Sequence, residues 1–309
     1  MNLITLASNG YRAVIYPKRG ANCISLRNLQ YRAKMLREPE NPDQLDNPYL
    51  YGMPILFPVN RIEKGIFVFD GRNYRFPINE PATGCHLHGF LHETPFEVVF
   101  QSEDQVICEY KATEKSPYLT FPHAFVMRIE YELTAQGLRQ TTEITNLSAQ
   151  RMPCLLGFHT TFNLCFADRS DSCDIRAKAE ITEEYERAMG STYLPTGRIL
   201  PFDDVSKSLA SGEWRPADAL ISRHYLAGET GEMRLTDIKR NLAVVYRNDA
   251  DFSHRLIYGG GETGFFCMEP QTCLVNAPNA PLLKEKIGVP SIFPGDTKRF
   301  SSFISLERI

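Results

Sequence analysis

Apolar and polar residues alternate with a period of two along much of the chain. The alternation is clearest over residues 125–133, and after a turn at Gln136-Gly137 it resumes over residues 138–144. Such alternation is typical of strands with one buried and one exposed face. Asp70-Gly71 separates two similar runs and predicts a tight hairpin. Further runs that predict strands span residues 66–69, 74–78, 96–100, 106–110, 242–246 and 300–306.

Helical patterns are few and short. Residues 206–209 and 282–286 each predict about one turn of helix, and no glycine-rich phosphate loop opens a long helix. A nucleotide-binding α/β fold is therefore disfavoured. Many strands with turns at short spacing predict an all-β fold, a large antiparallel β-sandwich with few short helices. Length would allow two average domains, but no linker or repeat divides the chain, and we expect one domain over residues 1–309.

The charge distribution argues against two classes of partner. The 34 basic and 37 acidic side chains give a net charge of −3, and the basic residues are scattered. Nucleic acids and membrane surfaces both require a concentrated basic field, so we expect neither as a partner. No apolar run approaches the roughly 20 residues that span a bilayer. Residues 2–8 are predicted to form a strand and not a signal peptide.

The eight cysteines are spread along the chain without a CxxC pair. An even number of cysteines does not by itself indicate disulfides in a chain of this length. We expect buried, reduced thiols in a cytoplasmic protein.

One carboxylate stands out as a candidate base. Glu269 follows the apolar run 265–268, and Pro270 after it suggests a strand end or an edge strand. Gln271 is expected on the same side of the strand as Glu269. Burial against an apolar wall would raise the pKa of Glu269 and make its carboxylate a stronger base.

Histidines on two other segments are candidate partners for this base. His86 and His88 are two positions apart and would face the same side of a strand, followed by Gly89, where a ligand can approach closely. The alternative is a surface histidine pair. His159 lies among polar and aromatic neighbours, and its alternative is a half-buried imidazole that is hydrogen-bonded to the backbone.

Arg61, in the run 58–62, is a candidate fork for substrate oxygens, or otherwise a surface salt bridge. A carboxylate and separated histidines on strand-like segments make an acid–base pair suited to proton transfer on a neutral polyol. This reasoning points to a small neutral ligand.

Several motifs, in order and spacing, resemble those of the aldose 1-epimerase (galactose mutarotase-like) family. The resemblance extends from about Gly20 to Asn279. It rests on Asn60-Arg61-Ile62, Gly65-Ile66-Phe67, the run Asp70 to Tyr74, Leu87-His88-Gly89, the run Gly157 to Leu164, the run Tyr193 to Gly197, and Met268-Glu269-Pro270-Gln271.

The resemblance implies a β-supersandwich with a sugar cleft on one concave face. It implies that Glu269 is the general base, His159 the general acid, His88 a second histidine near the ring oxygen, and Arg61 a hydroxyl-binding residue. The other candidate substrate-binding residues are Asn60, His86, Gln271 and Ser222. No metal or cofactor is expected, and the partner is a small-molecule sugar, bound by a monomer or homodimer.

The chain departs from the family pattern at two places. Ser222 stands where an aspartate that binds sugar hydroxyls is expected, although Asp218 or Asp237 could replace that acid. Phe90 stands in place of a second glycine after the first histidine motif. These departures bear on sugar preference and on activity, and they leave the acid–base residues in place.

A metal-dependent cupin is a competing interpretation. His86 and His88, with Glu93 five residues on, imitate a metal-ligand run, and His159 with Asn163 imitates a second one. The glycines and the Pro-x-Gly expected around these motifs are missing, and short ligand patterns often occur by chance.

Two further hypotheses keep the mutarotase-like scaffold. One is a non-catalytic protein that binds or senses sugars, since a fold does not fix a function. The second is an epimerase of phosphorylated hexoses, which would need extra basic side chains in the cleft. Arg223, Lys239 and Arg240 are available for that purpose, but the sequence does not place them there.

Overall fold

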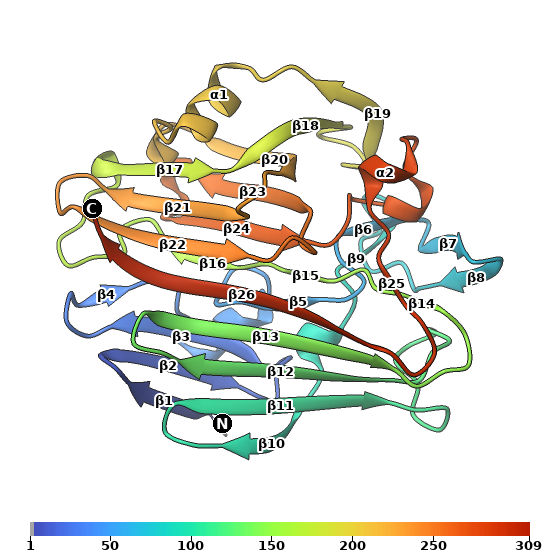
Figure 1. Ribbon diagram of the computed structural model, residues 1–309. Coiled ribbons are helices and arrows are strands. Elements are labelled where there is room, and N and C mark those ends of the chain that lie inside the picture. Colours follow the sequence, from blue (N-terminus) through green and yellow to red (C-terminus); the bar gives the residue numbers. More distant parts are fainter. Residues whose placement is uncertain (1–2) are drawn as a thin grey trace.

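The computed structural model describes residues 3–309 as two stacked layers of antiparallel strands (Figure 1). The layer at the front of Figure 1 is an eight-stranded sheet. Its strands, in spatial order from the bottom of the view, are β10 (Glu97–Gln101), β11 (Gln105–Ala112), β12 (Phe125–Leu133), β13 (Gly137–Asn146), β26 (Thr297–Arg308), β22 (Leu242–Asn248), β21 (Glu232–Asp237) and β17 (Ile175–Ala179).

The second layer lies behind the first in Figure 1 and consists of two sheets. An isolated bridge between Leu36 and Phe162 connects them. The larger sheet has the order β19 (Pro195–Leu200), β18 (Ile181–Arg187), β20 (Leu220–Ala227), β23 (His254–Gly260), β24 (Phe265–Gln271), β15 (Gly157–Phe158) and β5 (Ile55–Leu56), with β16 (Thr161–Asn163) also paired to β24. The smaller sheet has the order β1 (Ile4–Ser8), β2 (Tyr11–Tyr16), β3 (Asn22–Asn28) and β4 (Ala33–Lys34).

Short elements complete the described chain. Three two-stranded pairs join β6 (Arg61–Glu63) to β9 (Cys85–Leu87), β7 (Ile66–Phe69) to β8 (Arg72–Arg75), and β14 (Met152–Pro153) to β25 (Ser291–Ile292). The α-helices within residues 3–309 are α1 (Asp204–Ser211) and α2 (Lys284–Ile287), which match the two predicted helical segments. The 3₁₀ turns are η1 (Pro42–Asp46), η2 (Leu91–Glu93), η3 (Ser172–Asp174), η4 (Pro216–Asp218), η5 (Gly261–Thr263) and η6 (Ala277–Asn279).

The main core lies between the two layers and follows from the alternation in the sequence. In β12 every second side chain, from Phe125 to Leu133, is buried, while those between them are partly or fully exposed. Burying one such side chain contributes about 1.5–3 kcal/mol. The hairpin predicted at Asp70-Gly71 joins β7 to β8. The predicted all-β antiparallel sandwich is confirmed.

Strand β24 differs from the half-buried strands because all seven of its side chains are buried. Pro270 lies one residue before the end of β24, in agreement with the predicted strand end, but β24 is not an edge strand. Pro270 pairs with Arg255 of β23 on one side, inside the sheet. On the other side the ladder is interrupted between the pairs Gly157–Gln271 and Thr161–Cys267, so the missing N–H of the proline is tolerated.

The strand predicted near the start of the chain corresponds to β1, and only its first predicted residue, Asn2, lies outside the described residues. All eight cysteines are free in the described chain, but only six are buried, because Cys165 and Cys173 are exposed. Between residues 3 and 309 there is no helix that combines the length and the apolar character needed to cross a bilayer.

Candidate active site

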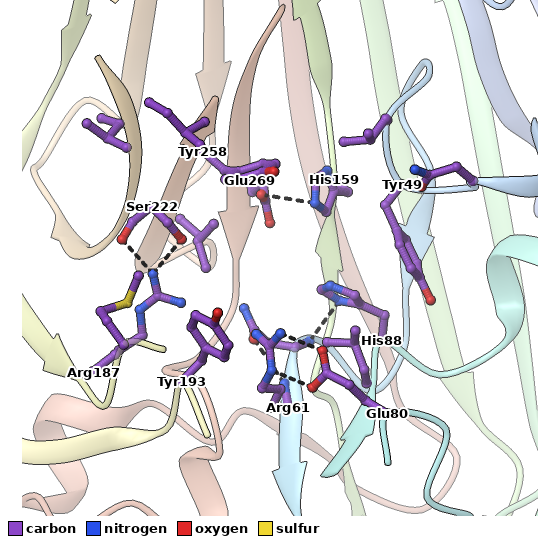
Figure 2. A pocket seen from close by; sticks show the side chains of 18 residues that line it. Tyr49, Arg61, Glu80, His88, His159, Arg187, Tyr193, Ser222, Tyr258 and Glu269 are labelled. Carbon is purple, nitrogen blue, oxygen red and sulfur yellow. Dashed lines mark hydrogen bonds and ion pairs between the residues drawn. The ribbon is translucent and has the colours of Figure 1, made fainter. Parts of the chain in front are cut away.

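A cavity of about 650 Å³ is lined by strands β18, β20, β23 and β24 of the second layer, by the β6–β9 pair and by neighbouring loops (Figure 2). Because antiparallel strands from distant parts of the chain meet there, the lining combines residues more than 200 positions apart. The polar and aromatic side chains that line it are Asn47, Tyr49, Asn60, Arg61, Glu80, His88, His159, Arg187, Tyr193, Ser222, Tyr258 and Glu269.

Glu269 and His159 meet at this cavity. His159 lies in the gap between β15 and β16, opposite the part of β24 that carries Glu269. Oε1 of Glu269 lies 3.3 Å from Nε2 of His159. Within residues 3–309, Oε1 of Glu269 and Nδ1 of His159 form no hydrogen bond. The two predicted acid–base residues are therefore in contact, and each has a polar atom that is free to form a hydrogen bond with a ligand.

Burial shifts the pKa values of this pair in opposite directions. Desolvation raises the pKa of Glu269 to about 8, although Arg187 favours its charged form. Desolvation also lowers the pKa of the His159 imidazole to about 3. Burial raises the pKa of Glu269 as predicted, and at neutral pH the pair holds one proton.

Gln271 forms a hydrogen bond with Glu269 and does not line the cavity. Its Nε2 donates to Oε2 of Glu269 at 3.3 Å, and its own Oε1 accepts from Nδ2 of Asn60 at 3.4 Å. The two side chains share a face of β24, as predicted. Asn60 does line the cavity, so this short network links the predicted base to the loop before β6.

His88 lines the cavity from a turn that follows β9. Its φ is 61°, a left-handed conformation, and Gly89 continues the turn at φ 64°. The backbone N–H of Asn60 donates to Nδ1 of His88 at 3.2 Å, which assigns the ring proton to Nε2. Burial lowers the pKa of this imidazole well below its usual value. His88 is therefore a neutral N–H donor at the cavity.

The prediction that His86 and His88 face the same side was wrong. His86 is still within β9, where its ring packs against Phe76 at 4.9 Å between centroids and its Nδ1 lies 2.7 Å from the carbonyl oxygen of Pro77. His88 lies beyond the strand, where the left-handed turn breaks the alternation of faces. His86 is therefore outside the cavity lining.

Arg61 reaches the cavity but is already held by other side chains. Its Nε and Nη2 donate to the two carboxylate oxygens of Glu80 at 2.7 and 2.6 Å. The guanidinium also lies over the ring of Tyr193, 4.7 Å from its centroid. Glu80 neutralises the charge and fixes the fork, so Arg61 offers oriented N–H groups with little net charge.

Arg187, at the end of β18, is a cavity residue that no sequence motif marked as a candidate. Nη2 of Arg187 donates to the carbonyl oxygen and to the hydroxyl of Ser222 at 2.7 and 2.8 Å (Figure 2). Ser222 therefore lines the cavity as expected, but it is bound to a cation. Neither Asp218 nor Asp237 lines the cavity, since they pair with Arg215 and Arg240.

The basic residues required by an epimerase of phosphorylated hexoses lie elsewhere. Arg223 pairs with Asp203 and Glu184, Lys239 with Asp174, and Arg240 with Asp237. None of the three basic residues belongs to the cavity lining.

The ligand set of a metal-dependent cupin is not assembled either. His86 lies outside the cavity lining, and Oε1 of Glu93 lies 3.8 Å from Nε2 of His92. A different group, formed by His159, Cys267 and Glu269, has ligand atoms within 4.8 Å of one another. Burial raises the pKa of the Cys267 thiol well above its usual value, and its sulfur contacts the hydroxyl of Thr161 at 3.4 Å. Metal binding would have to remove that proton.

The sequence profile of the family described as aldose 1-epimerase matches residues 2–289. The chain belongs to the aldose 1-epimerase family. A galactose mutarotase-like protein from Clostridium acetobutylicum is 27% identical, with a TM-score of 0.92 over 99% of this chain and 95% of that chain.

More distant members of the aldose 1-epimerase family share the fold. A galactose 1-epimerase from Lactobacillus acidophilus is 13% identical, with a TM-score of 0.72 over 99% of this chain and 94% of that one. Among curated proteins, the uncharacterised YihR of Escherichia coli K12 is 28% identical over 174 residues, which are 53% of this chain and 52% of YihR. The alignment with YihR therefore spans about half the length of that relative.

In this aldose 1-epimerase family member, six polar or aromatic residues of the cavity lining were not predicted as site residues, and three of them contact predicted ones as follows. Tyr49 places its ring 4.7 Å from that of His88 and 5.9 Å from that of His159, between centroids. Glu80 fixes Arg61, and Arg187 binds Ser222. The sequence indicates the position of Arg187 only if the pairing of β18 with β20 is known. Tyr185 pairs with His224 in antiparallel register, and continuing that register by two residues brings Arg187 opposite Ser222.

Proposed function

We propose that this protein is an aldose 1-epimerase that interconverts the α and β anomers of a hexose. The observation that carries the proposal is the 3.3 Å contact between a buried carboxyl and a buried imidazole at the cavity. In a pyranose, O1 and the ring oxygen O5 are bonded to the same carbon, C1. A base and an acid that touch one another can therefore serve both oxygens at once.

In the proposed mechanism, the carboxylate of Glu269 removes the proton from O1, and a C1=O double bond forms as the C1–O5 bond breaks. The imidazolium of His159 gives its proton to O5. The C1–C2 bond of the open aldehyde rotates, and the steps reverse on the other carbonyl face to give the other anomer. Each proton returns to its donor, so the cycle needs no net acid, base or oxidant. The N–H of His88, the N–H groups of Arg61 that Glu80 does not engage, and the side chain of Asn60 bind hydroxyls and hold the ring in place.

Polarimetry of freshly dissolved α-D-galactose or α-D-glucose tests the proposal directly. Galactose is a natural first choice, since the Lactobacillus protein is named a galactose 1-epimerase. The protein is expected to accelerate the approach to the equilibrium rotation in proportion to its concentration. Binding of these and other hexoses without any acceleration would instead support a protein that only binds or senses sugars.

The pH dependence of kcat/KM is expected to reflect the single proton shared by Glu269 and His159. The reactive pair needs a carboxylate and an imidazolium, which together hold one proton. Below about pH 3 both groups are protonated and the base is lost, whereas above about pH 8 both are deprotonated and the acid is lost. We therefore expect a plateau at neutral pH and a reversible decline above about pH 8, measured by polarimetry after subtraction of the hydroxide-catalysed rate. A rate that rises through pH 8 would contradict a shared proton.

Activity is expected to survive removal of metal ions. The proposed steps use only protons on Glu269 and His159, so dialysis against a chelator should change kcat by less than about twofold, an effect far below the contribution of either acid–base group. Elemental analysis of the purified protein provides the companion measurement. A stoichiometric metal whose removal abolishes activity would favour the group formed by His159, Cys267 and Glu269 as a metal site.

A further inference from the structure

Arg187 is a buried cation without an ion-pair partner. Its exposed fraction is 6%, and it lines the cavity together with Ser222. Both of its hydrogen bonds come from Nη2 and go to neutral oxygens of Ser222. Across residues 3–309, no carboxylate lies within ion-pair distance of Arg187, and Nε and Nη1 donate to no residue. Nε and Nη1 are thus left for a ligand, as two separate donors, because Ser222 occupies the Nη2 that both edges of the guanidinium fork share.

The charges around Arg187 are already balanced among themselves. Arg61 is neutralised by the bidentate contact with Glu80, and Glu184, a neighbour on β18, is paired with Arg223. Glu269 and His159 together hold one proton at neutral pH, so that the pair carries no net charge. Burial lowers the pKa of Arg187 to about 10, so this side chain stays charged. The cavity therefore carries close to one uncompensated positive charge.

A buried charge without a counter-ion is costly in a folded protein, and such groups are normally paired. The cost is removed when a ligand supplies the missing negative charge. The free N–H groups at Nε and Nη1 can each donate a charge-assisted hydrogen bond to an oxygen of a carboxylate or of a sulfate-type group, and Ser222 holds the guanidinium in a fixed orientation.

We propose that the preferred substrate is a hexose carrying a singly charged acid group, which binds at Arg187 while C1 lies at Glu269 and His159. Arg187, Glu269 and His159 line the same cavity, and in Figure 2 Glu269 lies between the other two across the view. This inference rests on the proposed function. A single free cation favours one negative charge over the two of a phosphate ester, which would leave one charge buried and unpaired.

Competition between acidic and neutral sugars tests the inference. We expect kcat/KM for D-galacturonate or galactose 6-sulfate to exceed that for D-galactose by at least about tenfold, because a charge-assisted hydrogen bond to an acid group gives the unpaired cation a partner. Arg187→Met should reduce this ratio by roughly 30-fold or more, and Arg187→Lys should restore part of it, since it keeps the charge but loses the planar group that Ser222 orients. Arg223→Met is the matched control, because Arg223 is paired outside the cavity, and it should leave the ratio unchanged.

Calorimetric titration of Glu269→Gln with galacturonate separates this inference from the proposed function. Tighter binding of galacturonate than of galactose supports an acid-binding site even if no anomer exchange is ever detected. Equal binding of the two sugars overturns the inference, as does a preference for galactose 6-phosphate over galactose 6-sulfate. A folded Arg187→Met variant with an unchanged ratio and an equal loss of kcat for both sugars would also overturn it. Arg187 would then act through the ionisation of Glu269, and the pH profile of that variant would shift.

Discussion

Replacement of Glu269 by glutamine is expected to lower kcat for anomer exchange by about 10²- to 10⁴-fold, the contribution of one general acid–base group. Glutamine has the shape of glutamate and retains a carbonyl oxygen that accepts a hydrogen bond, but it cannot take the proton from O1. Polarimetry with freshly dissolved α-D-galactose measures the loss. KM should change much less than kcat, because the sugar hydroxyls still meet Arg61, Asn60 and His88.

Thermal stability distinguishes this loss from misfolding. The folded-state pKa of Glu269, about 8, lies above its usual value of 4.5. Between these two pH values the carboxyl is ionised in the unfolded state but protonated in the folded state, so the free energy of unfolding falls as pH rises from about 4.5 toward 8. Removing the ionisable group should therefore leave Tm at pH 7 unchanged or raised. Glu184→Gln is the control for a buried glutamate outside the cavity, since Glu184 pairs with Arg223. It should retain anomer exchange. Unchanged kcat in Glu269→Gln would exclude Glu269 as the base.

The strands were predictable because a half-buried antiparallel strand requires alternating apolar and polar residues. In β12, the side chains that point between the layers are apolar and the others are mostly polar, so the pattern records the environment directly. Strand β24 illustrates the limit of that reasoning. It is buried on both faces and carries a proline inside the sheet, which is tolerated only because β15 and β16 leave a gap opposite it. The gap depends on where β15 and β16 lie, so the sequence of β24 alone could not reveal it.

Part of the site was predictable for a different reason. Glu269 and His159 stand in short motifs whose residue types suit acid–base chemistry, and each motif lies on one strand or at its end. His86 and His88 were misjudged, because the periodicity of a strand holds only while the strand continues. The chain leaves β9 at Leu87, and a left-handed residue follows.

Arg187 could not be predicted from its own neighbourhood. It ends the charged run Glu183-Glu184-Tyr185-Glu186-Arg187, which resembles an exposed strand in sequence. Its burial comes from β20, which lies beside β18 and brings Ser222 to the guanidinium. Tyr49 is similar, because it lies outside any strand and reaches the histidines only through tertiary packing. Contacts of this kind arise from pairing between distant segments and leave no local pattern.

Gly89→Ala is expected to destabilise the protein by about 2–5 kcal/mol. Gly89 has a φ of 64°, and an added Cβ would overlap the carbonyl oxygen of Phe57. A left-handed alanine costs about 1–2 kcal/mol, and the steric overlap adds about 1–3 kcal/mol. The overlap cannot be relieved cheaply, because it involves backbone at both positions and the N–H of Phe57 donates to the carbonyl oxygen of His88 at 3.3 Å. The expected fall in Tm is roughly 3–8 °C for a chain of 309 residues.

Gly84→Ala provides the matched control, because it isolates the backbone strain from the overlap. Gly84 precedes β9 and has a nearly identical φ of 67°, but an added Cβ there would meet no atom within 4 Å. It should therefore cost only the left-handed conformation, about 1–2 kcal/mol. The difference in Tm between the two variants measures the cost of the steric overlap between the turn after β9 and the backbone of Phe57.

Since that turn presents the imidazole of His88 to the cavity, the surviving folded fraction of Gly89→Ala should also have a raised KM for galactose, whereas Gly84→Ala should not. Equal loss of stability in the two variants would mean that the turn can move away from Phe57, and His88 would then be held mainly by its hydrogen bond from the backbone N–H of Asn60.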